Sequence, residues 1–223
     1  MREGLTFEFD RQRLFTDVGT LILSRFLMLR PRSLQLENVE LDREFQRRGV
    51  DLIWRRAIPG HEQTLVEIKC DTHAGTDETL ARSAEYPYYG LATSNFALET
   101  VANDVVGKPG WVFGSGADML LYYFAAIPRT IGEIEELWTA GEEYLLANLN
   151  LSGDLLYVID LPMLREWFVG VQQAYREIAA QNTSYRTRSR LVPCRDVLDA
   201  IEHCRLVEDV YRLVISAPGF PKF

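Results

Sequence analysis

The pattern of apolar and polar positions predicts that the chain opens with a helix. Apolar residues recur at helical spacing over residues 10–29 and form one stripe. The stripe consists of Leu14, Phe15, Val18, Leu21, Ile22, Phe26 and Leu29. Asp10 is the expected N-cap, and Pro31 prevents much continuation of the helix. We therefore expect an amphipathic helix whose apolar face lies against a core.

Runs of β-type residues follow, and the first two are typical of a hairpin. Residues 49–57 and 63–71 flank "IPGHE", whose Pro and Gly are turn signals. The mixed, charged residues 39–48 predict a short strand or an extended lead-in. Residues 72–90 are polar and predict a loop that could include one helical turn. Further strands are expected at 95–103, 118–127 and 183–193.

Two helix starts are marked by their capping residues. Thr130 and Glu133 have the spacing of a capping box, which predicts a helix of about 15 residues after Thr130. Asp160 followed by Pro162 predicts a second helix start, with the helical pattern running to residue 181. The second half of the chain is therefore expected to be richer in helix than the first.

The order of elements predicts a fold of the α/β class, with a mixed sheet and helices; the same arrangement can be described as α+β. A short helix near 195–203 and either a strand or a helix at 206–217 complete the pattern. We expect a core over residues 1–127 and a C-terminal extension over residues 128–223. That extension either packs on the same domain or forms one single domain with the core.

Composition excludes several classes of protein. The 223 residues are 47% hydrophobic and 25% charged, values of an ordinary globular protein, and no apolar run is long enough to span a membrane. The three cysteines form no C-x-x-C pair, so a reducing cytoplasm is the expected location. The net charge of −8 disfavours a protein that coats DNA, but it is compatible with an enzyme that has a local basic patch.

The stretch "LVEIKC" carries the first chemical signal. Glu67 and Lys69 are two residues apart on a predicted strand, so their side chains lie on one face, about 7 Å apart. One interpretation is a weak ion pair on a solvated sheet face. The other is a metal ligand beside a catalytic lysine. The residues around the stretch are needed to decide between them.

Asp51 lies on the preceding predicted strand, in "GVD". If the two strands pair, Asp51 and Glu67 can face the same side of one sheet. Close carboxylates repel each other, and burying them is costly unless a cation lies between them. Mg²⁺ takes such oxygen ligands, and the backbone carbonyl of Ile68 is within reach as a third.

Together, "GVD…VEIK" resembles the motif of the PD-(D/E)XK nuclease superfamily, the restriction-endonuclease-like fold. The resemblance covers residues 10–127 and implies an αβββαβ core. It implies that Asp51 and Glu67 bind Mg²⁺, with Mn²⁺ as an alternative, and that Lys69 is the catalytic lysine. Val50 stands where the motif has Pro, a substitution that leaves the chemistry unchanged.

Four further residues are candidates for supporting roles. Asp17 lies at the border of the apolar stripe, where family members often have an acidic metal ligand; a solvated helix edge is the alternative. Gln46 could hydrogen-bond a ligand or a phosphate. Asp71 either extends the polar face of its strand or ends the strand. Glu99 could add a carboxylate near the metal if its strand adjoins the motif strands, the alternative being a solvent-facing side chain.

Arginines supply the candidate contacts to nucleic acid. Arg186, Arg188 and Arg190 alternate along one predicted strand, which gives a row of donors suited to phosphates. A charged, solvated sheet edge is the alternative. Arg47 and Arg48 are nearer to the predicted catalytic residues.

The resulting hypothesis is Mg²⁺-dependent hydrolysis of phosphodiesters, with DNA as the expected substrate of an endonuclease and RNA as an alternative. Attack would come from a metal-activated water. A homodimer would suit cleavage of both strands. Two other interpretations remain: a noncatalytic domain of the same fold that binds nucleic acid or protein, and an unrelated α+β protein whose E-x-K is incidental.

Overall fold

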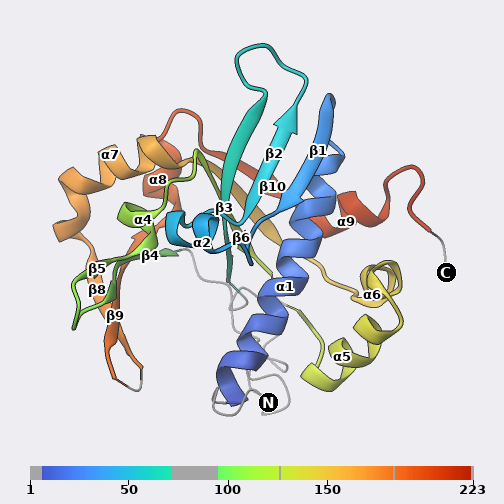
Figure 1. The fold of residues 1–223 in the computed structure, drawn as a ribbon, viewed down its shortest axis with the longest axis horizontal. Coiled ribbons are helices and arrows are strands. Elements are labelled where there is room, and N and C mark those ends of the chain that lie inside the picture. Colours follow the sequence, from blue (N-terminus) through green and yellow to red (C-terminus); the bar gives the residue numbers. More distant parts are fainter. Residues whose placement is uncertain (1–6, 72–94, 126, 183, 222–223) are drawn as a thin grey trace.

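The fold is a mixed α/β arrangement of two sheets and several helices (Figure 1). The computed structural model describes residues 7–71, 95–125, 127–182 and 184–221, with side chains from Arg13 onward. The loop expected at 72–90 lies outside the described residues. None of the described helices is long and apolar enough to cross a membrane.

The larger sheet has six strands in the order β1-β2-β3-β6-β7-β10. Strands β3 and β6 are parallel, whereas every other neighbouring pair is antiparallel. The expected hairpin is confirmed, because Leu52 pairs with Val66 and Ile53 with Leu65. The strands are β1 (Ser33–Asn38), β2 (Leu52–Arg56), β3 (Gln63–Asp71), β6 (Met119–Phe124), β7 (Leu155–Asp160) and β10 (Arg205–Glu208).

The smaller sheet is antiparallel, with the strand order β5-β4-β9-β8. The strand predicted at 95–103 belongs to this sheet, where it pairs with the strand predicted at 183–193. It therefore forms no ladder with β3. The strands are β4 (Asn95–Asn103), β5 (Lys108–Pro109), β8 (Arg176–Gln181) and β9 (Arg186–Pro193).

Helix α1 (Phe7–Met28) confirms the predicted first helix. It begins before Asp10, so the assignment of Asp10 as the N-cap is wrong. It ends three residues before Pro31. The predicted stripe is buried at its centre and half-buried or exposed at its ends: Phe15, Val18, Ile22 and Phe26 are buried, Leu14 and Leu21 are half-buried, and Leu29 is exposed beyond the helix.

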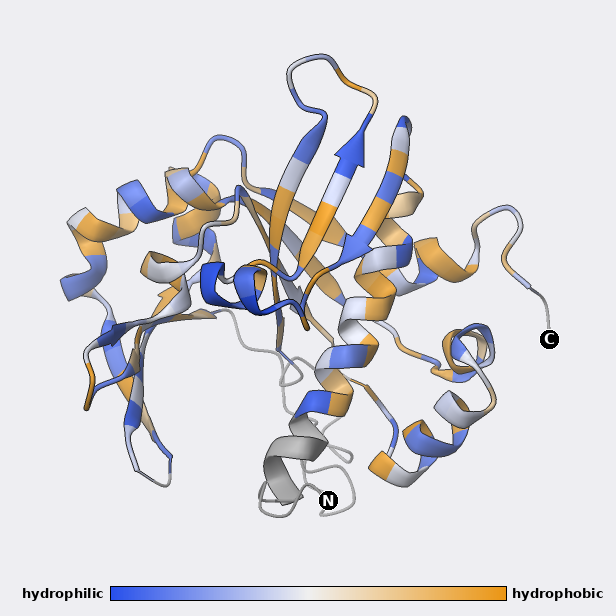
Figure 2. Ribbon diagram, viewed as in Figure 1, coloured by the Kyte–Doolittle hydropathy of each residue, from blue (hydrophilic) through white to orange (hydrophobic). Residues whose placement is uncertain are grey.

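Two apolar cores lie on the two faces of the six-stranded sheet, so the molecule has three layers (Figure 2). Alternation along β6 supplies both: Leu121 and Tyr123 face one core, and Leu120, Tyr122 and Phe124 face the other. The first core is covered by α1, α5 (Ile131–Thr139), α6 (Glu142–Asn148) and α9 (Val210–Ile215). The second is covered by the smaller sheet, α4 (Trp111–Gly114), α7 (Leu161–Val171) and α8 (Cys194–Ala200).

Residues 39–48 contain a helix, α2 (Arg43–Arg48), in place of the expected strand or lead-in. The Asp42 side chain accepts hydrogen bonds from the backbone N–H groups of Glu44 and Phe45, which satisfies two donors at the helix start. Gly49 ends the helix in the left-handed conformation, at φ +60°. These two caps outweigh the mixed hydropathy of the segment.

The C-terminal half shows how turns divide patterns that look continuous in sequence. The capping box of Thr130 and Glu133 is confirmed, but the helix stops at Thr139 because Gly141 adopts φ +114°, and α6 follows. The helix expected to run to residue 181 stops at Val171. A short 3-10 turn (Gln172–Ala174) and strand β8 replace its second half. Residues 206–217 supply both a strand and a helix, β10 and α9.

A buried acid fastens the C-terminal helix to the sheet. Asp154, 2% exposed, accepts hydrogen bonds at Oδ2 from the Tyr123 hydroxyl (2.7 Å) and from the backbone N–H of Tyr211 (3.0 Å). Its Oδ1 is buried without a hydrogen-bond partner. The Tyr211 hydroxyl donates to the carbonyl of Leu146 at 2.6 Å. Strand β6 and helices α6 and α9 are thus joined by one small polar network.

Candidate active site

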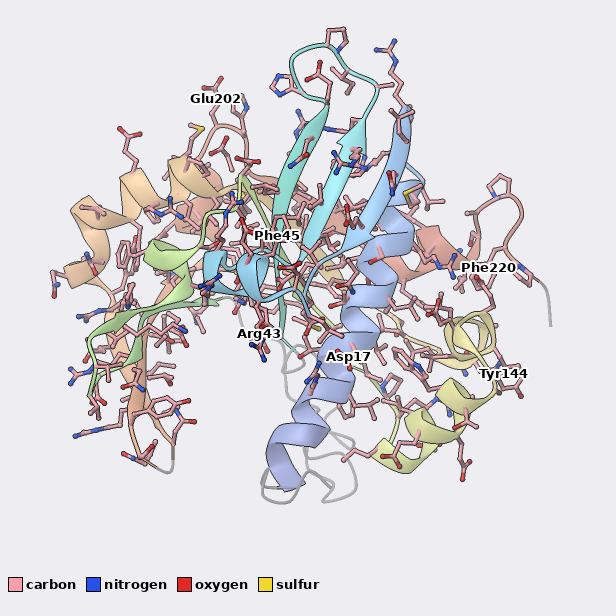
Figure 3. All side chains as sticks on the ribbon, viewed as in Figure 1. Asp17, Arg43, Phe45, Tyr144, Glu202 and Phe220 are labelled. Atoms are coloured by element: carbon pink, nitrogen blue, oxygen red, sulfur yellow. The ribbon has the colours of Figure 1, made fainter. Side chains whose placement is uncertain are left out.

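The first candidate residue, Asp51, is held between two neighbouring segments just before β2. Its backbone N–H donates to the carbonyl of Val66 on β3 at 2.8 Å, and its own carbonyl accepts from the N–H of Val39 at 2.9 Å. Figure 3 shows Phe45 on α2, the helix that precedes this turn. The N–H of Val50 donates to the Phe45 carbonyl, so α2 fixes the approach to Asp51.

Glu67 lies on β3, between the two residues to which Asp51 is hydrogen-bonded, and is almost completely buried, at 3% exposure. Its Oε1 forms an ion pair with Lys69 Nζ at 2.5 Å. Its Oε2 lies 3.3 Å from the Ser115 hydroxyl, which can donate a hydrogen bond to it. The same hydroxyl lies 2.6 Å from the carbonyl oxygen of Gly49. A Cβ at Gly49 would lie 3.1 Å from Glu67 Oε2, so a glycine is needed here for space as well as for its φ.

Lys69 remains partly accessible, with 33% of its side chain exposed. Its ammonium lies 5.7 Å from the centre of the Trp111 ring, at the start of α4. Glu99 on β4 accepts a hydrogen bond from the Trp111 backbone N–H at 3.4 Å. The charge of Glu99 contributes to raising the pKa of Lys69, although β4 and β3 belong to different sheets. The smaller sheet and α4 therefore form one wall beside the lysine.

The carboxylate of Asp51 turns toward β3. Its Oδ2 accepts a hydrogen bond from the backbone N–H of Ile68 at 2.6 Å. The N–H and C=O groups of one strand residue point to the same neighbouring strand. The carbonyl of Ile68 therefore faces the side on which Asp51 lies, as the expected third ligand position requires.

The charges of these residues influence one another. Burial raises the pKa of Glu67 and the charge of Asp51 raises it further, against the opposing effect of Lys69. Burial by itself would lower the pKa of Lys69, but attraction to Glu67 and Asp51 outweighs it and the pKa of Lys69 is raised. The lysine is therefore a cation at neutral pH, and its charge opposes the effect of burial on the pKa of Glu67.

The donor set suits a small divalent cation. Among the described residues, no group of three or more His, Cys, Asp and Glu side chains gathers as a metal cluster. Mg²⁺, however, commonly takes one or two carboxylates and keeps several waters. Asp51 and Glu67, with the Ile68 carbonyl, are the oxygen groups that would hold such a cation, and the metal site stays a prediction.

Asp17 lies apart from the three motif residues. It is on α1, which covers the opposite core, and its pKa is raised by burial. The nearby charge of Asp17 raises the pKa of Glu40, a residue that the sequence did not single out; burial has the larger effect on Glu40, and Asp51 adds to it. Glu40 thus links Asp17 to Asp51. The role of Asp17 as a metal ligand stays a prediction.

The other supporting candidates occupy the edges of the site. Gln46 is exposed on α2, and Asp71 ends β3 with its backbone carbonyl bonded to the N–H of Ala125. Arg47 is exposed, and its Nε donates to the carbonyl of Arg43 on its own helix. Among the described residues, no hydrogen bond or ion pair joins the side chain of Gln46 or Arg47 to Glu67 or Lys69.

Arg48 lies at the turn that carries Asp51, where its side chain could contact a substrate phosphate. Its carbonyl accepts a hydrogen bond from the Gly116 N–H at 2.5 Å, next to Ser115, and its guanidinium lies 5.6 Å from the centre of the Phe45 ring. Its side chain is exposed at the turn that carries Asp51. Arg48 is therefore a candidate nucleic-acid contact at the turn that carries Asp51.

The arginine row on β9 is engaged with acidic residues of its own sheet. Arg186 and Arg188 form ion pairs with Asp104, at 3.5 and 3.9 Å. Arg188 and Arg190 form ion pairs with Glu177 on β8, at 3.3 and 2.9 Å. Ion pairs between exposed side chains are weak, but the Arg190 side chain is only 15% exposed. The role of the row in nucleic-acid binding stays a prediction.

No pattern in the sequence pointed to three residues of this region, Ser115, Trp111 and Glu40. Ser115 lies in "GSGA", a stretch whose glycines indicated only a turn, and no spacing rule connects it with Glu67. Trp111 and Glu40 reach the site through tertiary packing as well. The one available signal was the capping pair of Asp42 and Gly49, which would have predicted α2 and the turn into Asp51.

Comparison of the chain with protein-family models, with curated proteins and with solved structures found no significant match. The geometry of the site therefore carries the functional argument.

Proposed function

We propose that the chain is a Mg²⁺-dependent nuclease of the PD-(D/E)XK type, most simply a DNA endonuclease. One observation carries the proposal: Asp51, just before β2, is hydrogen-bonded to Val66 and Ile68, the two residues that flank Glu67 on β3, and Lys69 is bonded to Glu67 at 2.5 Å. An incidental E-x-K pair on a solvated face would be exposed, whereas Glu67 is buried.

The order of elements also supports the proposal. Helix α1, the antiparallel strands β1, β2 and β3, and the parallel strand β6 follow the first and last parts of an αβββαβ core. The crossover from β3 to β6 departs from the simple pattern, because it contains β4 and β5 of the smaller sheet. Its one described helix, α4, has four residues. We interpret the smaller sheet as an insertion that reaches Lys69.

Each motif residue has a chemical task in this proposal. Asp51 and Glu67 would hold Mg²⁺ (or Mn²⁺) together with the Ile68 carbonyl. When bound, the cation supplies a more acidic water and neutralises charge on the phosphate. Lys69, protonated at neutral pH, would orient the attacking water and stabilise the negative charge that develops on the phosphate oxygens. The Ser115 hydroxyl lies 3.3 Å from the Glu67 carboxylate and is itself positioned by the carbonyl of Gly49.

DNA is the proposed substrate, with Arg48 at the site and the β9 arginines at a distance as phosphate contacts. The net charge of −8 predicts that binding is confined to this footprint and is sensitive to salt. The experiment incubates purified protein with plasmid, linear and branched DNA and with RNA, in Mg²⁺, in Mn²⁺ or in EDTA. We expect metal-dependent cleavage of DNA. Failure to cleave any of these substrates would refute the proposal and favour a noncatalytic binding domain.

A further inference from the structure

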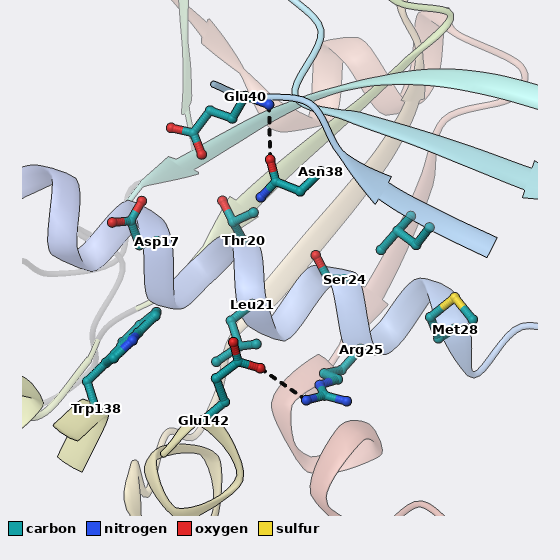
Figure 4. Close-up of a pocket in the computed structure, with 11 residues that line it drawn as sticks. Asp17, Thr20, Leu21, Ser24, Arg25, Met28, Asn38, Glu40, Trp138 and Glu142 are labelled. Atoms are coloured by element: carbon teal, nitrogen blue, oxygen red, sulfur yellow. Dashed lines mark hydrogen bonds and ion pairs between the residues drawn. The ribbon is translucent and has the colours of Figure 1, made fainter. Parts of the chain in front are cut away.

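Helix α4 and the residues that follow it border the candidate active site. The Ser115 hydroxyl lies 3.3 Å from Oε2 of Glu67. The centre of the Trp111 ring lies 5.7 Å from the Lys69 ammonium. The cavity on the α1 side, of about 420 Å³, is different, because Asp51, Glu67 and Lys69 are not among the residues that line it (Figure 4). The position of α4 therefore bears on the motif residues more directly than the shape of that cavity does.

An arginine of α7 caps the end of α4. Arg165 donates from Nε to the carbonyl of Val112 at 2.9 Å, and from Nη2 to the carbonyl of Ser115 at 2.6 Å. Carbonyls at the end of a helix have no partner within it, and they attract basic side chains. The Gly116 N–H, which would bond to Val112 if the helix continued, donates to the carbonyl of Arg48 instead. Arg165 thus satisfies two carbonyls that are left open where the chain leaves α4.

An apolar contact accompanies this polar one. The ring of Phe113 on α4 stacks on the ring of Phe168 on α7, with 5.8 Å between their centres and 19° between their planes. Phe168 is fully buried, and Arg165 is half-buried. Figure 1 shows α4 between α7 and α2. Helix α4 is therefore fixed to α7 by both the stacked rings and the arginine.

The packing around Ser115 transmits its position to Glu67. Ser115 is 4% exposed, and its hydroxyl oxygen accepts a hydrogen bond from the Ala117 N–H at 3.1 Å and lies 2.6 Å from the carbonyl oxygen of Gly49. A Cβ at Gly49 would lie 3.1 Å from Glu67 Oε2 and also 3.1 Å from Cα of Ser115. These three residues leave little room for a further carbon atom. In packing this close, a shift of Ser115 would alter the place of the Glu67 carboxylate.

We propose that Arg165 is a positioning residue of the candidate site, which holds Ser115 against Glu67 and so fixes the carboxylate that binds the cation. The inference rests on the proposed nuclease function, because it takes Glu67 to be a metal ligand. Arginine suits this role because its planar fork donates to two carbonyls at once, whereas lysine has a single ammonium. Through α7, residues 128–223 thus act on a site whose motif lies in residues 1–127.

The test measures the Mn²⁺ affinity of the full chain by electron paramagnetic resonance. Arg165→Met keeps an apolar stem and removes both hydrogen-bond donors. Loss of a residue that orients a metal ligand typically weakens metal binding about ten- to a hundredfold, so we expect a loss of about tenfold. Arg165→Lys can donate to one of the two carbonyls, and its affinity should lie between those of Arg165→Met and the wild type. The control Arg195→Ala removes an arginine of α8 that is 89% exposed, and it should leave the affinity unchanged.

A second control separates positioning from general stability. Asp154→Ala disrupts a network that contains none of the motif residues, and it should lower the free energy of unfolding without changing the Mn²⁺ affinity. Circular dichroism identifies a temperature at which every variant is folded, and the titrations are made there. A loss of Mn²⁺ affinity in Asp154→Ala as large as in Arg165→Met would show that Arg165 acts through stability alone, which would overturn the inference.

Amide hydrogen exchange without metal tests the contact itself. The N–H groups of Gly116 and Ala117 are hydrogen-bonded just after α4, so release of this segment in Arg165→Met should speed their exchange about tenfold. Arg195→Ala should leave it unchanged. Unchanged exchange, or Mn²⁺ affinity equal to that of the wild type, in Arg165→Met would overturn the inference and leave the proposed function. A wild type that binds no Mn²⁺, with exchange that still responds to Arg165→Met, would remove the proposed function and leave the contact.

Discussion

Replacement of Lys69 by Ala should reduce the rate of metal-dependent cleavage by about 10²–10³-fold. This is the usual effect of removing a side chain that transfers a proton, or that stabilises charge, in the transition state. The structure gives the reason. The ammonium of Lys69 is the one cation bonded to Glu67 among the described residues, and a third of the side chain remains accessible to substrate. The rate under single-turnover conditions, at saturating Mg²⁺, is the measurement.

Two variants control this prediction. Lys108→Ala removes an exposed lysine of β5 and should leave the cleavage rate unchanged, which excludes a general effect of one less positive charge. Lys69→Arg keeps the charge but replaces a compact ammonium by a larger planar group, and it should restore only part of the rate. Equal cleavage by wild type and Lys69→Ala would show that another residue does the chemistry, or that the activity is a contaminant.

Replacement of Asp154 by Ala should lower the free energy of unfolding by about 3 kcal/mol, because it leaves the Tyr123 hydroxyl and the Tyr211 N–H buried without an acceptor. For a chain of this length the loss corresponds to a fall in Tm of about 6–12 °C. Urea unfolding followed by circular dichroism gives the free energy. A loss below about 1 kcal/mol would mean that the network contributes no more than an ordinary surface contact.

Asp154→Asn separates the hydrogen bonds from the charge. The Asn carbonyl can accept both bonds, so most of the stability should return. Burial raises the pKa of Asp154, so the folded state binds its proton more tightly than the unfolded state does. The contribution of Asp154 to stability therefore falls as the pH rises from its unfolded pKa of about 3.9 through the raised value. The Asn variant should lack this decline, and an unchanged pH dependence would contradict the assignment.

The predictable part of the fold was the part set by local pattern. Period-2 alternation found strands β2, β3, β4, β6 and β9, and helical spacing found α1. Capping residues found the starts of α5 and α7. The ends of these helices could not be predicted in the same way, because Gly141 and the turn after Val171 act against an uninterrupted apolar pattern. The assignment of β4 to a second sheet depends on its long-range pairing with β9, which no local signal encodes.

The residues of the candidate site also fall into a group that the sequence could predict and a group that it could not. Asp51, Glu67 and Lys69 could be proposed together because two strands joined by a short turn bring the start of one strand close to the end of the other. Ser115 and Trp111 approach from a segment more than 40 positions further along the chain, and Glu99 from a different sheet. Their contributions arise from tertiary packing, so they became visible only in the structure.

The central claim is that Asp51 and Glu67 bind one divalent cation, and Mn²⁺ binding tests it most directly. Electron paramagnetic resonance measures free Mn²⁺ as the protein is titrated. We expect one site in the wild type, lost in Asp51→Asn and in Glu67→Gln, and retained in the control Glu62→Gln, which removes an exposed carboxylate of the β2–β3 turn. Absence of binding to the wild type, or binding that survives both Asp51→Asn and Glu67→Gln, would contradict the claim.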